Sequence, residues 1–426
     1  MTLKRHPVKT FFIDNSKFFG LCLICILLTG CSSNVRKIPD QVQAEINTMP
    51  AELRELYKLQ FIEGERNFVL NNMHIGVAAF EKGDFELAKR AFEDAILNIE
   101  YVYSDTEASA KARSLWHAEG AKTFKGEPYE RASIYYYLGL IDLIQGDYEN
   151  ARASFKSGVL QDAFAEEDQH QCDFALLIFL QGWASQLMGD EAFAIEAFKE
   201  VKKLRPDFQF PDLSHNTLLI AETGRSPRKL ADGVGHSELV YRRGKAFKEN
   251  RVKFRINNLQ TVAYPMEDIY FQSASRGGRA VDKILKGKAV FREKSSHIGL
   301  TLSNIANKAI LISPLLGSAG GVASMASGGV AVLGAVATFA AIHSNPHADV
   351  RYWKNLSDTV HIHTFQSDTA NLAVSAEYFD RKGRGYPSLT SAKTQIKSDN
   401  GSFFWFRSRS SFNVKNKWHN IFISNK

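Results

Sequence analysis

Apolar residues recur at helical spacing at the start of the first half of the chain. Between residues 40 and 72 they stand three or four positions apart, as from Val42 to Ile46 and from Leu53 to Tyr57. This spacing places them on one face of a helix. Pro50 suits a helix start near residue 51, because proline is tolerated in the first helical turn. We therefore predict that residues 40–72 are mostly helical.

One pattern of glycine, alanine and phenylalanine then occurs three times. In each copy a second glycine stands seven positions after the first, alanine follows five positions later and phenylalanine four positions after that. Aspartate always follows the second glycine. We predict helical hairpins in which the first glycine allows close packing, the second ends one helix and the aspartate caps the next. The three copies are Gly76, Gly83, Ala88 and Phe92; Gly139, Gly146, Ala151 and Phe155; and Gly182, Gly189, Ala194 and Phe198.

This repeat resembles the tetratricopeptide repeat (TPR), whose signature includes small and aromatic residues at such positions. The resemblance implies a solenoid of hairpins with a groove that binds other proteins. The spacing between copies is uneven, and most of the excess lies at residues 101–131. We therefore expect an interrupted solenoid. Unrelated hairpins in a helical bundle are the alternative.

The long insertion ends in the most distinctive local sequence of the chain. Pro128 suits the first turn of a helix, with two glutamates near its positive end. One interpretation is a helix start in which Tyr129 packs against its neighbours. The other is a polar-aromatic ledge that binds a partner segment. The candidate partner-binding residues here are Glu127, Tyr129, Glu130, Arg131 and Tyr135.

The periodicity changes to that of strands after residue 236, most clearly in the alternation at 251–256. Residues 279–308 look helical and basic, and residues 309–342 are rich in glycine and carry no charge. The uncharged segment forms either a buried hairpin or apolar loop, or a hairpin that inserts in a membrane or packs between copies. We prefer a β-sandwich built from both strand groups. The predicted strands are residues 238–241, 251–256, 260–264, 359–365, 372–379 and 402–407.

The N-terminus reads as a secretory signal. Lysine and arginine precede an apolar run at residues 18–28, whose last residue opens the sequence Leu28, Thr29, Gly30 and Cys31. These four residues resemble the lipobox of bacterial lipoproteins. The resemblance implies that residues 1–30 are removed, that Cys31 is acylated, and that Ser32 directs the protein to the outer membrane, facing the periplasm. An ordinary cleavable signal or N-terminal anchor is the alternative.

The formal net charge of +7 conceals an acidic first half and a basic second half. Basic surface in this compartment usually meets anionic lipid, lipopolysaccharide, peptidoglycan or an acidic partner, and nucleic acid is not expected. The two halves can also pack on each other by opposite charge. An acidic run, Glu166, Glu167 and Asp168, is usually solvated; the alternative is that it binds the basic half or a basic partner.

Three stretches of the first half, residues 126–131, 146–152 and 161–172, resemble a family of uncharacterised TPR-containing bacterial lipoproteins. The resemblance is strong over about residues 65–205 and weaker around 348–360. Some members of that family are associated with relatives of the curli secretion lipoprotein. The resemblance implies a scaffold role in the envelope.

Catalytic motifs are absent from the sequence: it contains no GxSxG, HExxH, P-loop or dinucleotide fingerprint. His361 and His363 share a strand face as metal ligands do, but without a third ligand nearby a surface strand is the better interpretation. Cys172 is expected to be a small buried residue. We predict no enzyme activity, no catalytic residue, no metal and no cofactor.

The sequence therefore predicts an α+β protein of three parts. Residues 1–30 are the lipoprotein signal, residues 31–225 a TPR-like helical domain, and residues 226–426 a basic β-rich domain with a helical, glycine-rich insertion at 276–342. We expect a lipid-anchored scaffold that binds other envelope proteins through the TPR-like groove. The alternative is a structural part of an oligomer or of an outer-membrane secretion or assembly complex, with residues 309–342 at the membrane.

Overall fold

The computed structural model describes residues 38–103, 123–163, 173–232, 238–244, 248–274, 348–368, 372–387, 392–398 and 401–412. Several predictions therefore fall outside the described residues. They concern the signal and lipidated Cys31, the acidic residues Glu166, Glu167 and Asp168, Cys172, and the insertion at 276–342.

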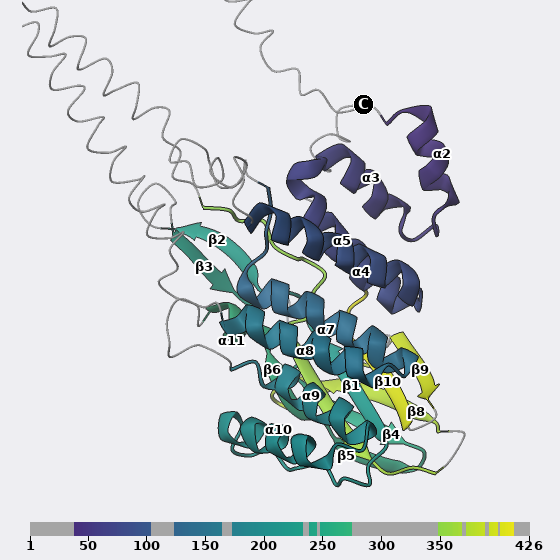
Figure 1. The fold of residues 1–426 in the computed structure, drawn as a ribbon, viewed down its shortest axis with the longest axis vertical. Coiled ribbons are helices and arrows are strands. Elements are labelled where there is room, and N and C mark those ends of the chain that lie inside the picture. Colours follow the sequence, from purple (N-terminus) through teal and green to yellow (C-terminus); the bar gives the residue numbers. More distant parts are fainter. Residues whose placement is uncertain are drawn as a thin grey trace, which may run out of the picture.

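Helices fill the first half of the described chain, and the helical prediction for residues 40–72 is confirmed (Figure 1). The chain begins with α2 (Asp40–Thr48), α3 (Arg54–Glu63) and the short 3-10 helix η1 (Glu65–Asn67). Three antiparallel hairpins follow. They are α4 (Phe68–Lys82) with α5 (Phe85–Tyr103), α7 (Pro128–Gln145) with α8 (Tyr148–Ala163), and α9 (Ala175–Leu187) with α10 (Glu191–Leu204).

Each hairpin is closed by the predicted contact between glycine and phenylalanine. A Cβ placed on Gly139 would lie 2.4 Å from the nearest ring carbon of Phe155. The corresponding distances are 2.5 Å from Gly76 to Phe92 and 2.7 Å from Gly182 to Phe198. Real Cβ atoms do not approach a ring this closely, so glycine is what allows the ring to lie on the first helix of each pair.

The turns of the three hairpins also follow the prediction. Gly83, Gly146 and Gly189 have φ values of 83°, 79° and 82°, the left-handed conformation that glycine adopts without cost. The next residue caps the second helix: Oδ1 of Asp84 accepts the N–H of Leu87 at 3.1 Å. Asp147 and Asp190 make the same bond to the residue three positions on, at 3.2 Å each. Local sequence therefore determines both the stop and the restart of each helix.

Two stacked sheets form the second half. The larger has the order β6 (Tyr264–Asp268), β7 (Thr359–Phe365), β1 (Thr217–Thr223), β10 (Gly401–Arg407) and β9 (Ala392–Ser398); β1 and β10 are parallel and the other pairs antiparallel. The smaller has the order β5 (Leu259–Val262), β4 (Arg251–Ile256) and β8 (Val374–Phe379). A separate hairpin pairs β2 (Arg228–Asp232) with β3 (Glu238–Arg242), and helix α11 (Ile269–Ala274) follows β6.

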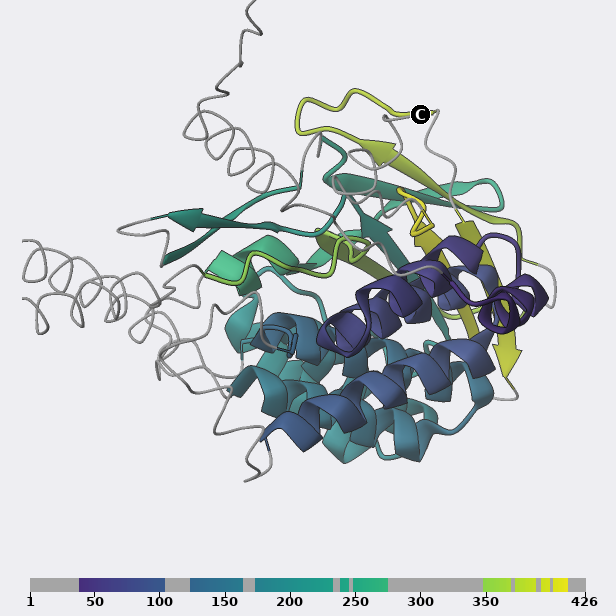
Figure 2. The same ribbon diagram turned by 90° about the horizontal axis from the view of Figure 1, so that it is seen from above.

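The larger sheet is apolar on both faces. Side chains alternate along a strand, so Leu218 and Ile220 of β1 join the core beneath the helices, while Leu219 and Ala221 pack with Phe254 of the smaller sheet. A sandwich built from both strand groups is therefore present. The face of the larger sheet that turns away from the smaller sheet carries the helices, which Figure 2 shows gathered on one side of the strands. The fold is α+β, and its two halves share one core.

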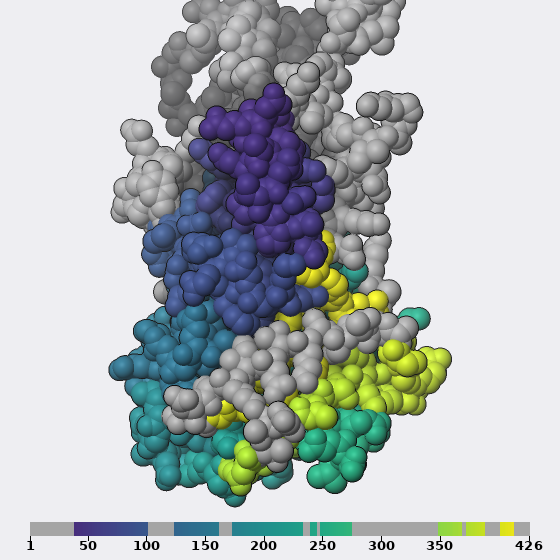
Figure 3. Space-filling view, turned by 90° about the vertical axis from the view of Figure 1, so that its right-hand side faces the viewer, coloured from purple at the N-terminus to yellow at the C-terminus, as the bar shows by residue number. Residues whose placement is uncertain are grey.

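The first helix of each hairpin is covered on all sides. Residues 69–80 of α4, nearly all of α7 after its first residue, and residues 175–186 of α9 are almost without exception buried. The second helices, α5, α8 and α10, each expose one face and form the outer layer. Figure 3 shows the helices following one another from the purple N-terminal end to the teal third hairpin, beside the yellow-green C-terminal strands. Within the described residues, no helix combines the length and apolarity needed to cross a membrane.

Candidate functional site

The predicted partner groove is filled by the chain itself. The face of α4 and α7 that turns away from their hairpin partners packs against the larger sheet and against residues 348–358, which precede β7. The Trp353 ring is fully buried. Its centre lies 6.0 Å from the ring centre of Phe92 and 5.9 Å from that of Tyr137. Asn355 donates its amide to the carbonyl of His74 at 2.9 Å. The face on which the sequence predicts a partner groove therefore packs against the second half of the same chain.

The predicted ledge at the start of α7 is likewise an internal contact. Pro128 occupies the first turn, and Glu127 and Glu130 form a reciprocal capping box, so the helix-start interpretation is confirmed. Glu130 is fully buried; one carboxylate oxygen accepts the backbone N–H of Trp353 at 2.8 Å and the other the ammonium of Lys229 at 2.8 Å. The Glu130 carboxylate is thus closed to solvent and bonded within the chain.

The remaining predicted ledge residues also face the chain itself. Tyr129 is 1% exposed. Arg131 is buried and donates to Oε1 of Gln161 at 2.8 Å and to the carbonyl of Gly126 at 3.0 Å. Tyr135 and Glu127 are half-buried. Tyr129, Glu130 and Arg131 are thus buried within the chain, and their binding of a partner stays a prediction.

A second buried ion pair joins the halves beneath α7. Oε2 of Glu222 on β1 accepts from Nη1 of Arg407 on β10 at 2.6 Å and from the hydroxyl of Tyr137 at 2.8 Å. Its other oxygen accepts from Nε1 of Trp405 at 3.0 Å and from Tyr136 at 3.2 Å. Burial and the adjacent carboxylate raise the pKa of both tyrosine hydroxyls well above the usual value, so they remain donors. The network is saturated and has no room for a ligand.

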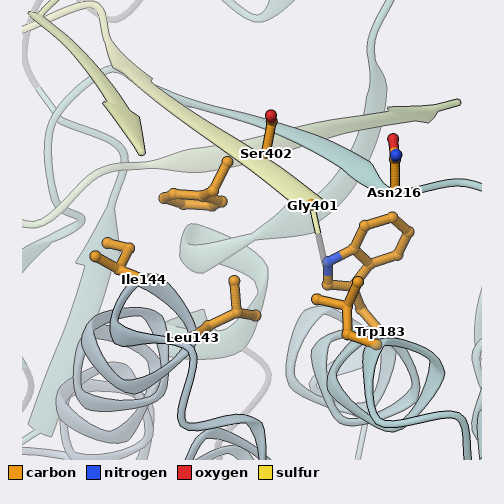
Figure 4. Close-up of a pocket in the computed structure, with 8 residues that line it drawn as sticks. Leu143, Ile144, Trp183, Asn216, Gly401 and Ser402 are labelled. Atoms are coloured by element: carbon orange, nitrogen blue, oxygen red, sulfur yellow. The ribbon is translucent and has the colours of Figure 1, made fainter. Parts of the chain in front are cut away.

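A small gap lies between the ends of α7, α9, β1 and β10. Figure 4 shows Leu143 and Ile144 below the strand that carries Gly401 and Ser402, with the Ser402 side chain pointing away from them and Trp183 on a second helix. The volume of the gap is about 10 Å³, which is no more than a single water molecule requires. It is a packing defect rather than a binding site.

A much larger hollow opens at the edge of the larger sheet. Two adjoining cavities of about 460 and 450 Å³ share Arg243, Asn250 and Arg381, and we call them together the cleft. This volume is typical of small-molecule sites. Cationic side chains outnumber carboxylates among its lining residues. These are Arg205, Arg243, Lys248, Arg381, Lys382 and Arg384 against Glu267, Asp268 and Asp380.

Two arginines of the cleft are held by buried acids. Nη2 of Arg205 lies 3.0 Å from Oε1 of Glu267, whose side chain is closed to solvent. Arg243 binds Asp358 at 2.5 Å and also pairs with Asp268. Burial raises the pKa of Glu267 to about 7, and that of Asp358 to about 7, against the pull of their arginines. These pairs fix the guanidinium groups in position.

Three other cations of the cleft form no ion pair with any described residue: Lys248, Arg381 and Lys382, all exposed. The turn that carries the latter two is ordered by Asp380. Its Oδ1 accepts the backbone N–H of Lys382 at 2.8 Å and of Arg384 at 2.9 Å, and its Oδ2 pairs with the Arg384 guanidinium at 2.7 Å. The turn therefore presents two charged side chains from a fixed backbone.

Two polar groups of the cleft wall lack partners among the described residues. His361 is 1% exposed; its Nε2 meets the hydroxyl of Thr359 at 3.2 Å, and its Nδ1 bonds to nothing described. The amide oxygen of Asn250 is also unbonded. Burial lowers the pKa of His361 to about 4, so the ring is neutral at neutral pH.

The predicted surface strand with two histidines is corrected for His361. Strand β7 lies inside the sheet, between β6 and β1, and the His361 side chain is buried rather than on the surface. His363 is half-buried and stacks on Phe365 with 6.0 Å between ring centres. The part of the chain that the structure describes holds no group of three or more histidine, cysteine or acidic side chains placed to bind a metal.

Sequence reasoning missed the cleft because its residues come from distant positions. Arg205 follows α10, Arg243 follows β3, and Arg381 follows β8. The one available signal was the basic character of the second half, including the run Arg381-Lys382-Gly383-Arg384. Comparisons with models of protein families, with curated proteins and with solved structures give no match.

Proposed function

We propose that this chain is a lipid-anchored binding protein of the bacterial envelope. Its TPR-like hairpins serve as a rigid internal scaffold, and its partner, an anionic component of the envelope, binds in the cleft. The function is binding rather than catalysis, and the anchor is the acylated Cys31.

One contrast carries the proposal. The face of the hairpins on which a TPR solenoid would bind a partner is occupied by Trp353, Asn355 and the larger sheet. The cleft, by comparison, has room for a ligand and presents Lys248, Arg381 and Lys382 without ion-pair partners among the described residues. Unpaired cations in a hollow attract anions from a distance and raise the association rate.

The lipobox-like sequence supports the envelope location. Acylation at Cys31 by two or more chains would hold the protein stably at a membrane. Only residues 32–39 stand between that cysteine and the start of α2. The described fold would then work close to the membrane surface.

Site-specific photo-crosslinking in intact cells tests the proposal. A photoreactive residue replaces Lys382 at the cleft, and a matched variant carries it at Lys156, an exposed position of α8. We expect a reproducible crosslinked product from position 382 that is absent or weaker at position 156. Equal products from both positions, or none from position 382, would contradict a binding role for the cleft.

The anchor is tested separately with Cys31→Ser. We expect the wild-type chain in the outer-membrane fraction and the variant in the soluble periplasmic fraction. A variant that stays in the membrane fraction after carbonate extraction would show that another segment holds the chain there.

A further inference from the structure

The cleft has features that select among anions. Its lining combines the unpaired cations described above, two neutral side chains that each hold one polar atom without a partner among the described residues, and an apolar wall of Pro265, Met266 and Phe271. The Phe271 side chain is 47% exposed although it is large and apolar. We infer that the cleft binds a phosphate monoester that also carries hydroxyl groups, of the type of a phosphorylated sugar.

The charge of the cleft favours a phosphate over a carboxylate. Arg205, Arg243 and Arg384 are each paired with a carboxylate of this chain. Lys248, Arg381 and Lys382 are the cations left for a ligand. A phosphate monoester carries between one and two negative charges at neutral pH and offers three acceptor oxygens, so one such group can engage several cations together.

The neutral groups favour a ligand with hydroxyls. His361 Nδ1 and the Asn250 amide oxygen are held in the wall without a hydrogen-bond partner among the described residues. An unsatisfied buried polar atom costs about 1–3 kcal/mol, so such atoms are usually satisfied by water or by a ligand. A hydroxyl group both donates and accepts, and it therefore suits either tautomer of His361.

The exposed cations line one of the two adjoining cavities, and His361 and Phe271 line the other. Arg381 and Asn250 line both cavities, Lys248 and Lys382 line one, and His361 and Phe271 line the other. A ligand that spans the two cavities meets the cations at one end and the histidine and the aromatic ring at the other. The apolar C–H face of a sugar ring matches the exposed face of Phe271, as sugars commonly pack on aromatic side chains.

This inference rests on the proposed use of the cleft as the binding site, but its test is independent of the crosslinking. The full chain in detergent is titrated by calorimetry with glucose 6-phosphate, and separately with glucose and with inorganic phosphate. We expect glucose 6-phosphate to bind at least about tenfold more tightly than either part alone, a difference of about 1.4 kcal/mol.

Two cleft variants and one control define the site. Arg381→Ala with Lys382→Ala removes two exposed cations, and Asn250→Asp adds a negative charge without a change of shape. Each should weaken glucose 6-phosphate binding at least about tenfold. The control, Lys156→Ala with Lys199→Ala, removes the same charge from exposed faces of α8 and α10. It should change the affinity less than about twofold.

Three results would overturn the inference. The first is no binding of glucose 6-phosphate at millimolar concentration. The second is equal weakening by the control variant, which would mean attraction to the net charge alone. The third is binding to phosphatidylglycerol vesicles without binding to the soluble ester, which would assign the cations to a membrane surface. An acidic protein crosslinked from position 382, together with no affinity for glucose 6-phosphate, would leave the proposed function standing and remove this inference.

Discussion

Glu222 and Arg407 form an ion pair of 2.6 Å between the parallel strands β1 and β10, at 0% and 2% side-chain exposure. The two residues are far apart in the chain, and both point from the sheet toward α7. The Glu222 carboxylate accepts four hydrogen bonds, two on each oxygen. The donors are Arg407, Trp405, Tyr136 and Tyr137. The pair therefore connects the larger sheet to α7 through Tyr136 and Tyr137.

Breaking this pair from one side should be costly. Arg407→Met leaves the Glu222 carboxylate buried without its cation, and we expect a loss of about 3–5 kcal/mol in the free energy of unfolding. Adding Glu222→Gln removes the stranded charge while keeping an acceptor for the tyrosines, so the double variant should be more stable than Arg407→Met alone. Urea denaturation of the wild type, Arg407→Met, Glu222→Gln and the double variant measures this. Additive losses would show that the two side chains are not coupled.

The close contact in the second hairpin predicts a steric effect. Gly139→Ala places a methyl group 2.4 Å from the Phe155 ring, and overpacking of this kind costs about 1–3 kcal/mol. Adding Phe155→Leu should recover part of the loss, because the smaller side chain leaves space for the methyl group. Thermal unfolding of the single and double variants measures the effect. If the double variant loses as much stability as the two single variants lose in sum, steric conflict between the methyl group and the ring is not the cause.

Residues 348–358 should contribute strongly to stability through Trp353. Trp353→Ala removes a fully buried ring between Phe92 and Tyr137, and we expect a loss of about 3–5 kcal/mol. Val350→Ala is a matched truncation in the same segment, at a side chain that is 44% exposed, and should cost less than about 1 kcal/mol. Urea denaturation compares them. Equal small losses would mean that the segment is not part of the core.

His74 should make the fold sensitive to acid. Burial and the nearby Lys354 lower the pKa of His74 to about 3, while its imidazole Nε2 accepts the backbone N–H of Lys354 at 3.2 Å. Between pH 6.5 and pH 3, His74 is protonated in the unfolded chain but not in the folded chain. The free energy of unfolding therefore falls as the pH falls. The slope is about 1.4 kcal/mol per pH unit for one such group.

His74→Gln keeps a hydrogen-bond acceptor but does not titrate. We expect the dependence of the unfolding free energy on pH to become shallower by about that slope between pH 6 and pH 4, with no change in slope above pH 7.5. Glu267 and Asp358 act in the opposite sense, because their raised pKa values make the folded chain take up protons below about pH 7. They are present in both proteins, so their effect cancels in the comparison. An unchanged slope in the variant would contradict a neutral buried His74.

Local sequence was sufficient wherever the controlling contact lies within one hairpin or one strand. The glycine, aspartate and phenylalanine of each repeat meet within some twenty residues of one another, and their roles as close approach, stop and cap were predictable. Strands β4 and β7 were predicted with their observed bounds, Arg251–Ile256 and Thr359–Phe365. The strong local pattern determined these elements.

Tertiary structure decided what depends on distant residues. Strand β1, Thr217–Thr223, is buried at every position, so it shows no alternation and was not predicted as a strand; it also lies before the expected domain boundary at residue 225. It pairs with β7 and β10 from the other half of the chain. The same pairing brings residues 348–358 onto the face of the hairpins expected to bind a partner.

The sequence by itself thus determined the helical hairpins, most of the strands and the α+β class, because these follow from short-range periodicity and turn chemistry. Only the tertiary structure decided which surfaces remain available. Glu130 and Tyr129 are buried where the β2–β3 hairpin and Trp353 pack on them. The cleft is assembled by Arg205, Arg243 and Arg381 from three separate segments. Both depend on long-range packing of apolar faces, which no local pattern encodes.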